Sequence, residues 1–173
     1  MFARITPLIV IIMIIALGYV GLMQNNKDSG SNHSYSIRKA PSLTVEALAG
    51  YESPPLESLS GQFVLVNFFA SWCGPCAAEM EVLTGIPDDV VIYGVAWRDT
   101  PETLLPWLKR MPPAYDYVAM DKHNETSIYY GSTGVPESFV INPRGEIVAH
   151  HAGPLTKTVV NNVLLPALKK DKK

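Results

Sequence analysis

Cysteine is scarce in this sequence, and neither sign of charge dominates it. The 173 residues include two cysteines, charged side chains make up 17% of the total, and the formal net charge is −2. A composition without a basic surplus gives no reason to expect nucleic-acid binding. The sequence also lacks internal repeats and low-complexity tracts, so we expect one ordinary domain with short additional segments.

One long hydrophobic run, at residues 5–23, contains no charged side chain. As a helix rising about 1.5 Å per residue, it would nearly cross a bilayer core of about 30 Å. A signal peptide cleaved near residues 16–18 is the alternative, but the run continues past that site to Met23. We therefore predict an uncleaved transmembrane signal anchor. Arg4 precedes it, so the positive-inside rule assigns residues 1–4 to a cytoplasmic tail.

The segment after this run, residues 24–40, is polar and rich in serine and asparagine. Such a composition cannot bury a hydrophobic core, so we expect a flexible tether in the periplasm. The folded domain is predicted to occupy residues 41–173.

From residue 41 onward, apolar runs typical of buried strands alternate with segments that favour helices. Short connections between them indicate parallel neighbours, whereas Pro143-Arg144-Gly145 predicts an antiparallel hairpin. The expected fold class is α/β, with a mixed central sheet and helices on both faces. Residues 43–59 add edge structure. The predicted strands are 62–70, 90–97, 117–121, 138–142 and 146–152, and the predicted helices are 76–84, 100–110, 124–130 and 156–170, the last bent at Pro166.

The two cysteines, Cys73 and Cys76, are separated by two residues. A disulfide across so short a loop adds only about 2 kcal/mol, so a purely structural role is disfavoured. Structural zinc needs about four ligands, and His150 and His151, adjacent on a predicted strand, point to opposite faces. A haem-attachment motif would need histidine where Ala77 stands. We expect neither a metal nor a bound cofactor.

A redox role explains the pair better, because it lies where a buried strand meets a helix. Cys73 just precedes the helix, whose free N–H groups and dipole lower the pKa of its thiol and favour the nucleophilic thiolate. Cys76, in the first turn, is close enough to resolve a mixed disulfide. Trp72 is a bulky neighbour that can shield the pair. Cys-x-x-Cys after an apolar strand within a βαβ pattern is a strong signal for this chemistry.

Trp72-Cys73-Gly74-Pro75-Cys76 after VNFFAS resembles the thioredoxin superfamily, and Gly134-Val135-Pro136 before a later strand is similar to its proline loop. The resemblance covers about residues 41–170 and implies a thioredoxin-like fold in which Pro136 is cis and packs beside the cysteines. On the residues alone an ordinary trans proline would be favoured, since only about 5% of X-Pro bonds are cis. The resemblance also implies substrate contacts by Trp72, Gly74, Pro75, Val135 and Pro136.

At Asn67 the sequence departs from thioredoxin itself. The resemblance implies a buried aspartate at this position, which handles the proton of the inner cysteine. An amide cannot ionise, so another acid or water must do so. Glu79, three residues after Cys76 on the same predicted helix face, and Glu137, directly after Pro136, are the candidates. The alternative is that both are surface charges, and Asp99 is a further, weaker candidate.

Three features together resemble the membrane-anchored DsbE/CcmG-type subfamily of cytochrome c biogenesis. They are Asn67, the Cys-x-x-Cys-x-x-Glu motif ending at Glu79, and Gly-Val-Pro-Glu-Ser-Phe at 134–139. The resemblance implies a thiol:disulfide oxidoreductase in the bacterial inner membrane, with its soluble domain in the periplasm. The implied substrate is the disulfide of apocytochrome c or of its carrier, a maturation-complex thiol protein. The implied electron donor is a membrane thiol transporter of the DsbD/CcdA type.

Other functions of the same fold remain open. A general periplasmic disulfide oxidase or isomerase is the nearest, because the residues between the cysteines strongly affect the reduction potential. A peroxide reductase would need a peroxidatic cysteine in another setting, and the sequence has no third cysteine. A copper-binding chaperone would usually space its cysteines by three residues and add a histidine, for which His151 would have to approach Cys73.

Overall fold

The computed structural model describes residue 13 and residues 37–171. The predicted anchor, except Met13, and the tether as far as residue 36 lie outside the described residues. Within the described part of the chain, no helix is long and apolar enough to cross a bilayer. The chain divides into two units, Met1–Ser34 and Tyr35–Lys173, and the second unit contains the predicted domain.

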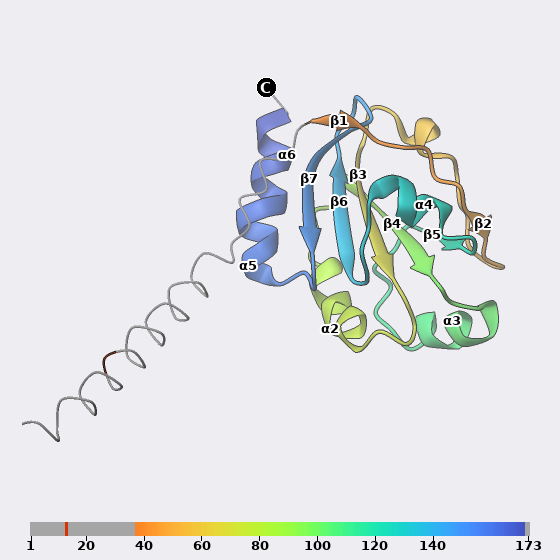
Figure 1. Cartoon of the computed structure of the whole chain (residues 1–173). Coiled ribbons are helices and arrows are strands. Elements are labelled where there is room, and N and C mark those ends of the chain that lie inside the picture. Colours follow the sequence, from red (N-terminus) through yellow and green to blue (C-terminus); the bar gives the residue numbers. More distant parts are fainter. Residues whose placement is uncertain (1–12, 14–36, 172–173) are drawn as a thin grey trace, which may run out of the picture. The chain divides into compact units, whose positions relative to one another are not determined.

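A single seven-stranded sheet forms the centre of this unit, with strand order β1-β7-β6-β3-β4-β5-β2 (Figure 1). Strands β3, β4 and β5 are parallel, and β6, β7 and the two short edge strands pair antiparallel with their neighbours. The predicted mixed sheet and hairpin are therefore confirmed. The strands are β1 Arg38–Lys39, β2 Glu46–Ala47, β3 Phe63–Phe69, β4 Val90–Trp97, β5 Tyr117–Asp121, β6 Glu137–Ile141 and β7 Glu146–Ala152.

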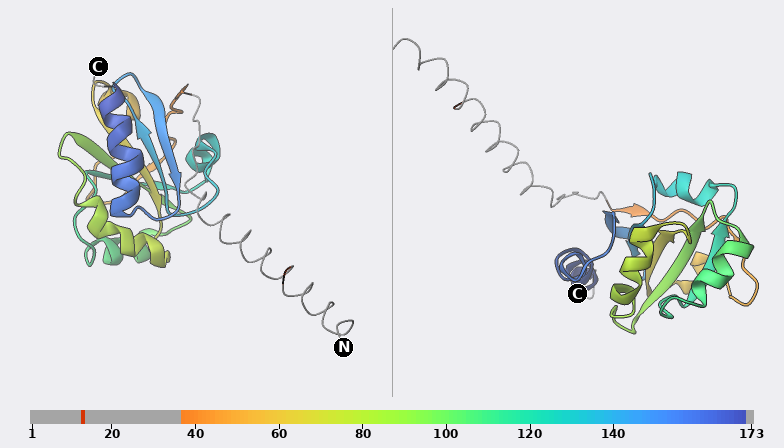
Figure 2. Two further views of the ribbon diagram at one scale, coloured as in Figure 1. Left: turned by 90° about the vertical axis from the view of Figure 1, so that its left-hand side faces the viewer. Right: turned by 90° about the horizontal axis from the view of Figure 1, so that it is seen from below.

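Helices cover both faces of the sheet (Figure 2). One face packs against α2, α3 and the C-terminal helical segment, and the other packs against α4 and a short 3-10 helix, η2. This arrangement confirms the predicted layers. The helical elements are η2 Leu56–Leu59, α2 Gly74–Leu83, α3 Pro101–Leu108, α4 Glu125–Tyr130, α5 Lys157–Val159, η3 Val160–Leu164 and α6 Leu165–Asp171.

Strand β3 is buried along its whole length and contributes to the core on both faces. Alternation of side chains along a strand places Phe63, Leu65 and Phe69 against α2, and Val64, Val66 and Phe68 against α4. The same parity puts the polar side chain of Asn67 on the α2 face, inside the core. This strand therefore carries both the cysteine loop at its end and a buried amide below it.

The folded domain begins before the predicted boundary at residue 41. Arg38 and Lys39, assigned above to the tether, form β1 and pair with Ile147 and Glu146 of β7. The free edge of β7 offers backbone groups to any extended neighbour, and Arg38 is also held by a 2.8 Å hydrogen bond to the Tyr130 carbonyl. Local composition gives no sign of this pairing.

The predicted continuous helix 156–170 is interrupted by a π-helical turn, η3. The Leu165 N–H donates to the Val160 carbonyl, five residues back, instead of to a carbonyl four residues back. Pro166 follows and has no N–H to donate, so regular helical bonding is broken here. The irregularity thus lies just before the proline at which a bend was predicted.

Candidate active site

The two cysteines lie where β3 passes into α2, as predicted, and form a disulfide. Cys73 is the N-cap of α2, and the backbone N–H of Cys76 donates to its sulfur at 3.2 Å. Helix α2 begins at Gly74, two residues before the predicted start at residue 76, and Pro75 lies in its first turn, where a missing N–H costs nothing. Cys73 retains 5% exposure and Cys76 none, so attack by a partner falls on Cys73.

The peptide bond between Val135 and Pro136 is cis, as the resemblance implied. Glu137, the next residue, begins β6 and pairs with Phe68 near the end of β3. This register brings Pro136 to the end of the sheet from which the cysteine loop departs. The cysteine pair and the cis-proline loop are therefore neighbours, although about 60 residues separate them in sequence.

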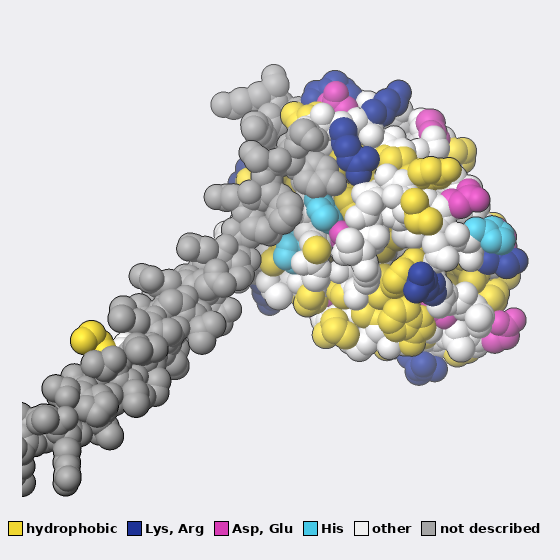
Figure 3. Space-filling model, in the orientation of Figure 1, with side chains coloured by type: hydrophobic (Ala, Val, Ile, Leu, Met, Phe, Trp, Pro, Cys, Tyr) yellow, Lys and Arg dark blue, Asp and Glu magenta, His cyan; other side chains and the backbone are white. Residues whose placement is uncertain are grey.

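Trp72 is the large exposed side chain beside the disulfide, with 58% of its surface accessible. Its indole N–H donates to the Arg98 carbonyl at 3.0 Å, and its ring lies 6.3 Å from that of Trp97. The Arg98 guanidinium in turn lies 4.4 Å from the Trp97 ring centroid. Figure 3 shows hydrophobic side chains gathered over the edge that carries α2 and α3. Trp72 is thus an anchored aromatic surface that a partner can contact.

Asp99, the weaker acid candidate, ties the cysteine loop to α3. One carboxylate oxygen accepts the Ser71 N–H at 2.6 Å, and the other accepts the Ser71 hydroxyl, the Thr100 N–H and the Thr103 hydroxyl. With all these donors already bound, Asp99 has the contacts of a structural clamp and not those of a proton shuttle.

Glu79 is a buried acid, 1% exposed, on the face of α2 that packs against the sheet. Its carboxylate accepts the side-chain N–H of Asn67 at 3.0 Å and the backbone N–H of Leu155 at 2.7 Å. Burial raises the pKa of Glu79 above its ordinary value, and the bonds from Leu155 and Asn67 oppose this only partly. A carboxyl group with a raised pKa, one helical turn after Cys76, holds a proton more tightly than an exposed glutamate and is a candidate for proton exchange with that cysteine.

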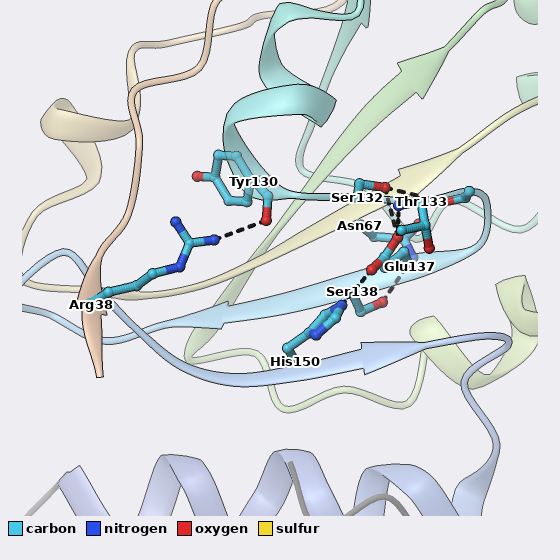
Figure 4. A network of polar contacts seen from close by, with 9 residues as sticks. Arg38, Asn67, Tyr130, Ser132, Thr133, Glu137, Ser138 and His150 are labelled. Atoms are coloured by element: carbon cyan, nitrogen blue, oxygen red, sulfur yellow. Dashed lines mark hydrogen bonds and ion pairs between the residues drawn. The ribbon is translucent and has the colours of Figure 1, made fainter. Parts of the chain in front are cut away.

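The side chain of Asn67 is the centre of this buried network. Its Nδ2 donates to Glu79 and also to the Ser138 hydroxyl at 3.0 Å, while its Oδ1 accepts the Tyr115 hydroxyl at 2.6 Å. Figure 4 shows Asn67 and Ser138 side by side across β3 and β6. Sequence reasoning missed Ser138, Tyr115 and the Leu155 amide. The one available signal was Gly94, an isolated glycine in a buried strand, which marks a close approach by another group.

Glu137, also buried at 2% exposure, lies on the other face of the sheet. It contacts His150 Nε2 and accepts the Ser132 hydroxyl at 2.7 Å and the Thr133 N–H at 2.9 Å (Figure 4). Burial alone would raise the pKa of Glu137, but the bonds from His150, Ser132 and Thr133 together lower it below its ordinary value. The interpretation of Glu79 and Glu137 as surface charges is wrong for both. Only Glu79 shares the α2 face with Cys76.

Among the described residues, no group of three or more histidine, cysteine or acidic side chains is arranged to hold a metal ion. His150 lies on the Glu137 side of the sheet, stacked on Phe139 at 4.3 Å. His151 pairs with Ser138 and so lies on the α2 side. The two histidines thus point to opposite faces, as their adjacency on a strand predicted.

The arrangement of this site suits reversible thiol:disulfide exchange. It combines a disulfide at a helix N-terminus, a neighbouring cis proline and a buried acid on the same helix. The Cys76 N–H at the start of α2 donates to the Cys73 sulfur, and N–H groups at a helix N-terminus stabilise negative charge. A buried carboxyl group beside the inner cysteine can take and return its proton.

Comparisons with known proteins agree with this chemistry. The family model described as AhpC/TSA matches residues 37–150. The thiol:disulfide interchange protein HelX of Rhodobacter capsulatus is 35% identical, over 94% of this chain and 96% of its own. The DsbE homolog of Paracoccus denitrificans is 33% identical, over 97% of each chain.

A solved structure of a thioredoxin-family thiol:disulfide interchange protein from Chlorobium tepidum has a TM-score of 0.64 at 22% identity. It covers 81% of this chain and 99% of that one, and shows the same thioredoxin-like fold. With the disulfide, the cis proline and the aligned relatives in agreement, the chain belongs to the AhpC/TSA family of thioredoxin-like proteins and is a thiol:disulfide oxidoreductase of the DsbE type.

Proposed function

We propose that this protein is a membrane-tethered periplasmic reductase that reduces the disulfide of apocytochrome c, or of its carrier, so that haem can attach. The observation that carries the proposal is the buried Glu79 next to Cys76, held by Asn67 and by the Leu155 amide. Asn67 and Glu79 both belong to the motifs by which the sequence resembles the cytochrome c biogenesis subfamily, and their side chains are hydrogen-bonded to each other.

The reaction begins with the reduced protein. The Cys73 thiolate attacks one sulfur of the partner disulfide, a new S–S bond forms, and the partner's other sulfur leaves as a thiolate and is protonated. Cys76 then loses its proton to Glu79 and attacks the Cys73 sulfur, which releases the second partner thiol. Two electrons pass to the partner, and the protein is left with the Cys73–Cys76 disulfide that the structure contains.

The two buried glutamates have different roles in this scheme. Glu79 handles the proton of Cys76, because the two side chains share the buried face of α2. Glu137 positions the loop before Pro136 through Ser132 and Thr133. Trp72, Gly74, Pro75, Val135 and Pro136 form the surface on which the partner chain is placed for attack.

Residues 5–23 serve as the single-pass inner-membrane anchor and residues 24–37 as a periplasmic tether. The alignment with the Rhodobacter and Paracoccus relatives covers nearly the whole chain, so the N-terminal segment is part of the similarity. An oxidising periplasm would exhaust an isolated dithiol, and the reductase therefore requires an electron-donating membrane thiol transporter. The redox group is the cysteine pair itself, without a bound cofactor.

Reduction of a model substrate tests this function. The reduced full-length protein is mixed with an oxidised peptide containing Cys-x-x-Cys-His or with a control peptide of the same composition and scrambled order. We expect preferential reduction of the first peptide, and loss of c-type cytochromes in a deletion strain that added thiol reductant restores. Equal reduction of both peptides, with normal cytochromes in the deletion strain, would favour a general oxidase or isomerase.

A further inference from the structure

The hydrogen bonds around Asn67 fix which way its side-chain amide points. Tyr115 donates its hydroxyl proton to Oδ1, so the amide nitrogen is directed toward Glu79 and Ser138. An amide oxygen can only accept and an amide nitrogen can only donate. A donor at Oδ1 therefore favours the orientation that supplies Glu79 with an N–H, which stabilises its carboxylate form.

Three features hold the partly buried Tyr115 ring against the core. The ring stacks on Phe69 with centroids 4.7 Å apart. It also lies against Gly94, where an added Cβ would come within 2.9 Å of the ring. The adjacent Asp116 binds both backbone groups of Ile92, through its N–H at 2.9 Å and its carboxylate at 2.7 Å. The hydroxyl is thus delivered to Asn67 by a fixed loop.

We propose that Tyr115 is a positioning residue for the redox site, whose hydroxyl orients and polarises the Asn67 amide so that this amide supports the Glu79 carboxylate. Donation to Oδ1 makes the N–H groups of the same amide stronger donors, because hydrogen bonds in a chain polarise one another. The inference rests on the proposed function in one respect, that Glu79 exchanges a proton with Cys76.

The groups that surround Glu79 allow the effect to be isolated. Among the described residues, titratable groups on the same side of the sheet as Glu79 include Cys76 on α2, Tyr115 from the loop before β5, and His151, which pairs with Ser138 across β6 and β7. Burial and the Glu79 charge raise the pKa of Tyr115 far above its usual range, so it stays a hydroxyl donor. Burial lowers the pKa of His151. The remaining contacts of Glu79 are the neutral Asn67 side chain and the Leu155 backbone amide.

The test measures the pKa of Glu79 directly, by carboxyl-carbon NMR on the full-length oxidised protein labelled at glutamate. In Tyr115→Phe the amide loses its oriented donor, and we expect the pKa of Glu79 to rise by about one pH unit, a tenfold change in proton affinity. Tyr117→Phe is the matched control, since Tyr117 packs on Tyr93 at the other face. An unchanged Glu79 pKa in Tyr115→Phe would overturn the inference.

A second variant disturbs the hydrogen bond between Tyr115 and Asn67 without removing the Tyr115 hydroxyl. Gly94→Ala places a methyl group against both Tyr115 and Phe69, and should displace the ring from Asn67. We expect it to raise the pKa of Glu79 in the same direction as Tyr115→Phe. A folded Gly94→Ala protein with an unaltered Glu79 titration would also contradict the positioning role.

Thiol reactivity separates this inference from the proposed function. The alkylation rate of the reduced protein is measured across pH for Tyr115→Phe, Glu79→Gln and the double variant. If Tyr115 acts through Glu79, its effect on the pH profile disappears in the double variant. If the NMR shift is present but Glu79→Gln leaves the profile unchanged, the positioning role stands and the proton role of Glu79 fails. A Tyr115→Phe effect of equal size in both backgrounds would refute action through Glu79.

Discussion

Glu79 and Glu137 are both buried, but they lie on opposite sides of the same sheet. Glu79 binds Asn67 on the α2 side, whereas Glu137 pairs with Phe68 and binds His150 on the α4 side. Sequence spacing from the cysteines and from Pro136 made the two carboxylates equivalent candidates. Their positions separate a group that can exchange a proton with Cys76 from one that holds the proline loop.

The first prediction concerns the thiols. Removing the negative charge of Glu79 should lower the pKa of the Cys76 thiol by about one unit, because a nearby carboxylate disfavours a thiolate. Glu137→Gln is the matched control and should leave the thiol titration unchanged. The measurement is thiolate absorbance against pH in the reduced protein, which reports a buried thiol as well as an accessible one. If both glutamine variants, and their combination, titrate like the wild type, neither carboxylate tunes the thiols.

The second prediction concerns stability above pH 4.5. The pKa of Glu79 is raised in the folded state, so folded protein binds more protons than unfolded protein above the ordinary value of 4.5. The free energy of unfolding should therefore fall as pH rises from about 4.5 through the folded-state pKa. Glu79→Gln should lack this slope. Urea titrations of oxidised wild type and Glu79→Gln at closely spaced pH values would measure this slope. If the free energy of unfolding depends on pH in the same way for both proteins, the pKa of Glu79 is not raised.

The third prediction has the opposite sign. The pKa of Glu137 is lowered in the folded state, so its stabilising effect is present above 4.5 and is lost as pH falls through the folded-state pKa. Glu137→Gln should cost roughly 2–3 kcal/mol at pH 7 and much less in strong acid, since it weakens charge-assisted bonds from His150, Ser132 and Thr133. A cost independent of pH would mean that packing, and not charge, is what the variant loses.

The fourth prediction concerns partner contact through Trp72. Truncating this exposed, anchored indole to alanine should reduce kcat/KM for a protein disulfide about tenfold, as for aromatic residues at interface centres. Reduction of glutathione disulfide, which is too small to span the surface, should change little. The exposed Tyr129 offers a control substitution of similar size, on α4. An equal loss with both substrates would instead indicate an altered disulfide.

Local sequence was enough to predict β3, α2 and the hairpin, because burial, helix capping and turn residues act over a few positions. The cis bond at Pro136 was expected only through resemblance to a family, and it is confirmed. The start of the domain and the π-helical turn were missed. β1 forms by pairing with β7, which lies more than 100 residues away in sequence, and η3 lies directly before Leu165 and Pro166, where the Leu165 N–H donates five residues back.

Some features of the site could likewise be predicted from local sequence, and others could not. Cys73 and Cys76 could be identified from their spacing, whereas the separation of Glu79 from Glu137 depends on the register between β3 and β6. Tyr115 reaches Asn67 from 48 residues away. Only the tertiary fold brings these groups together, so residue spacing alone could not predict their hydrogen bonds.

One measurement tests the central claim most directly. Replacing Cys76 with serine stops the reaction after Cys73 has attacked, so the partner stays bound through a mixed disulfide that can be purified from cells and identified. The account predicts apocytochrome c, a maturation-complex thiol protein or the membrane thiol transporter. Cys73→Ser is the control and should trap none of them. A broad mixture of secreted folding proteins would contradict a dedicated reductase, while leaving the disulfide chemistry of the site intact.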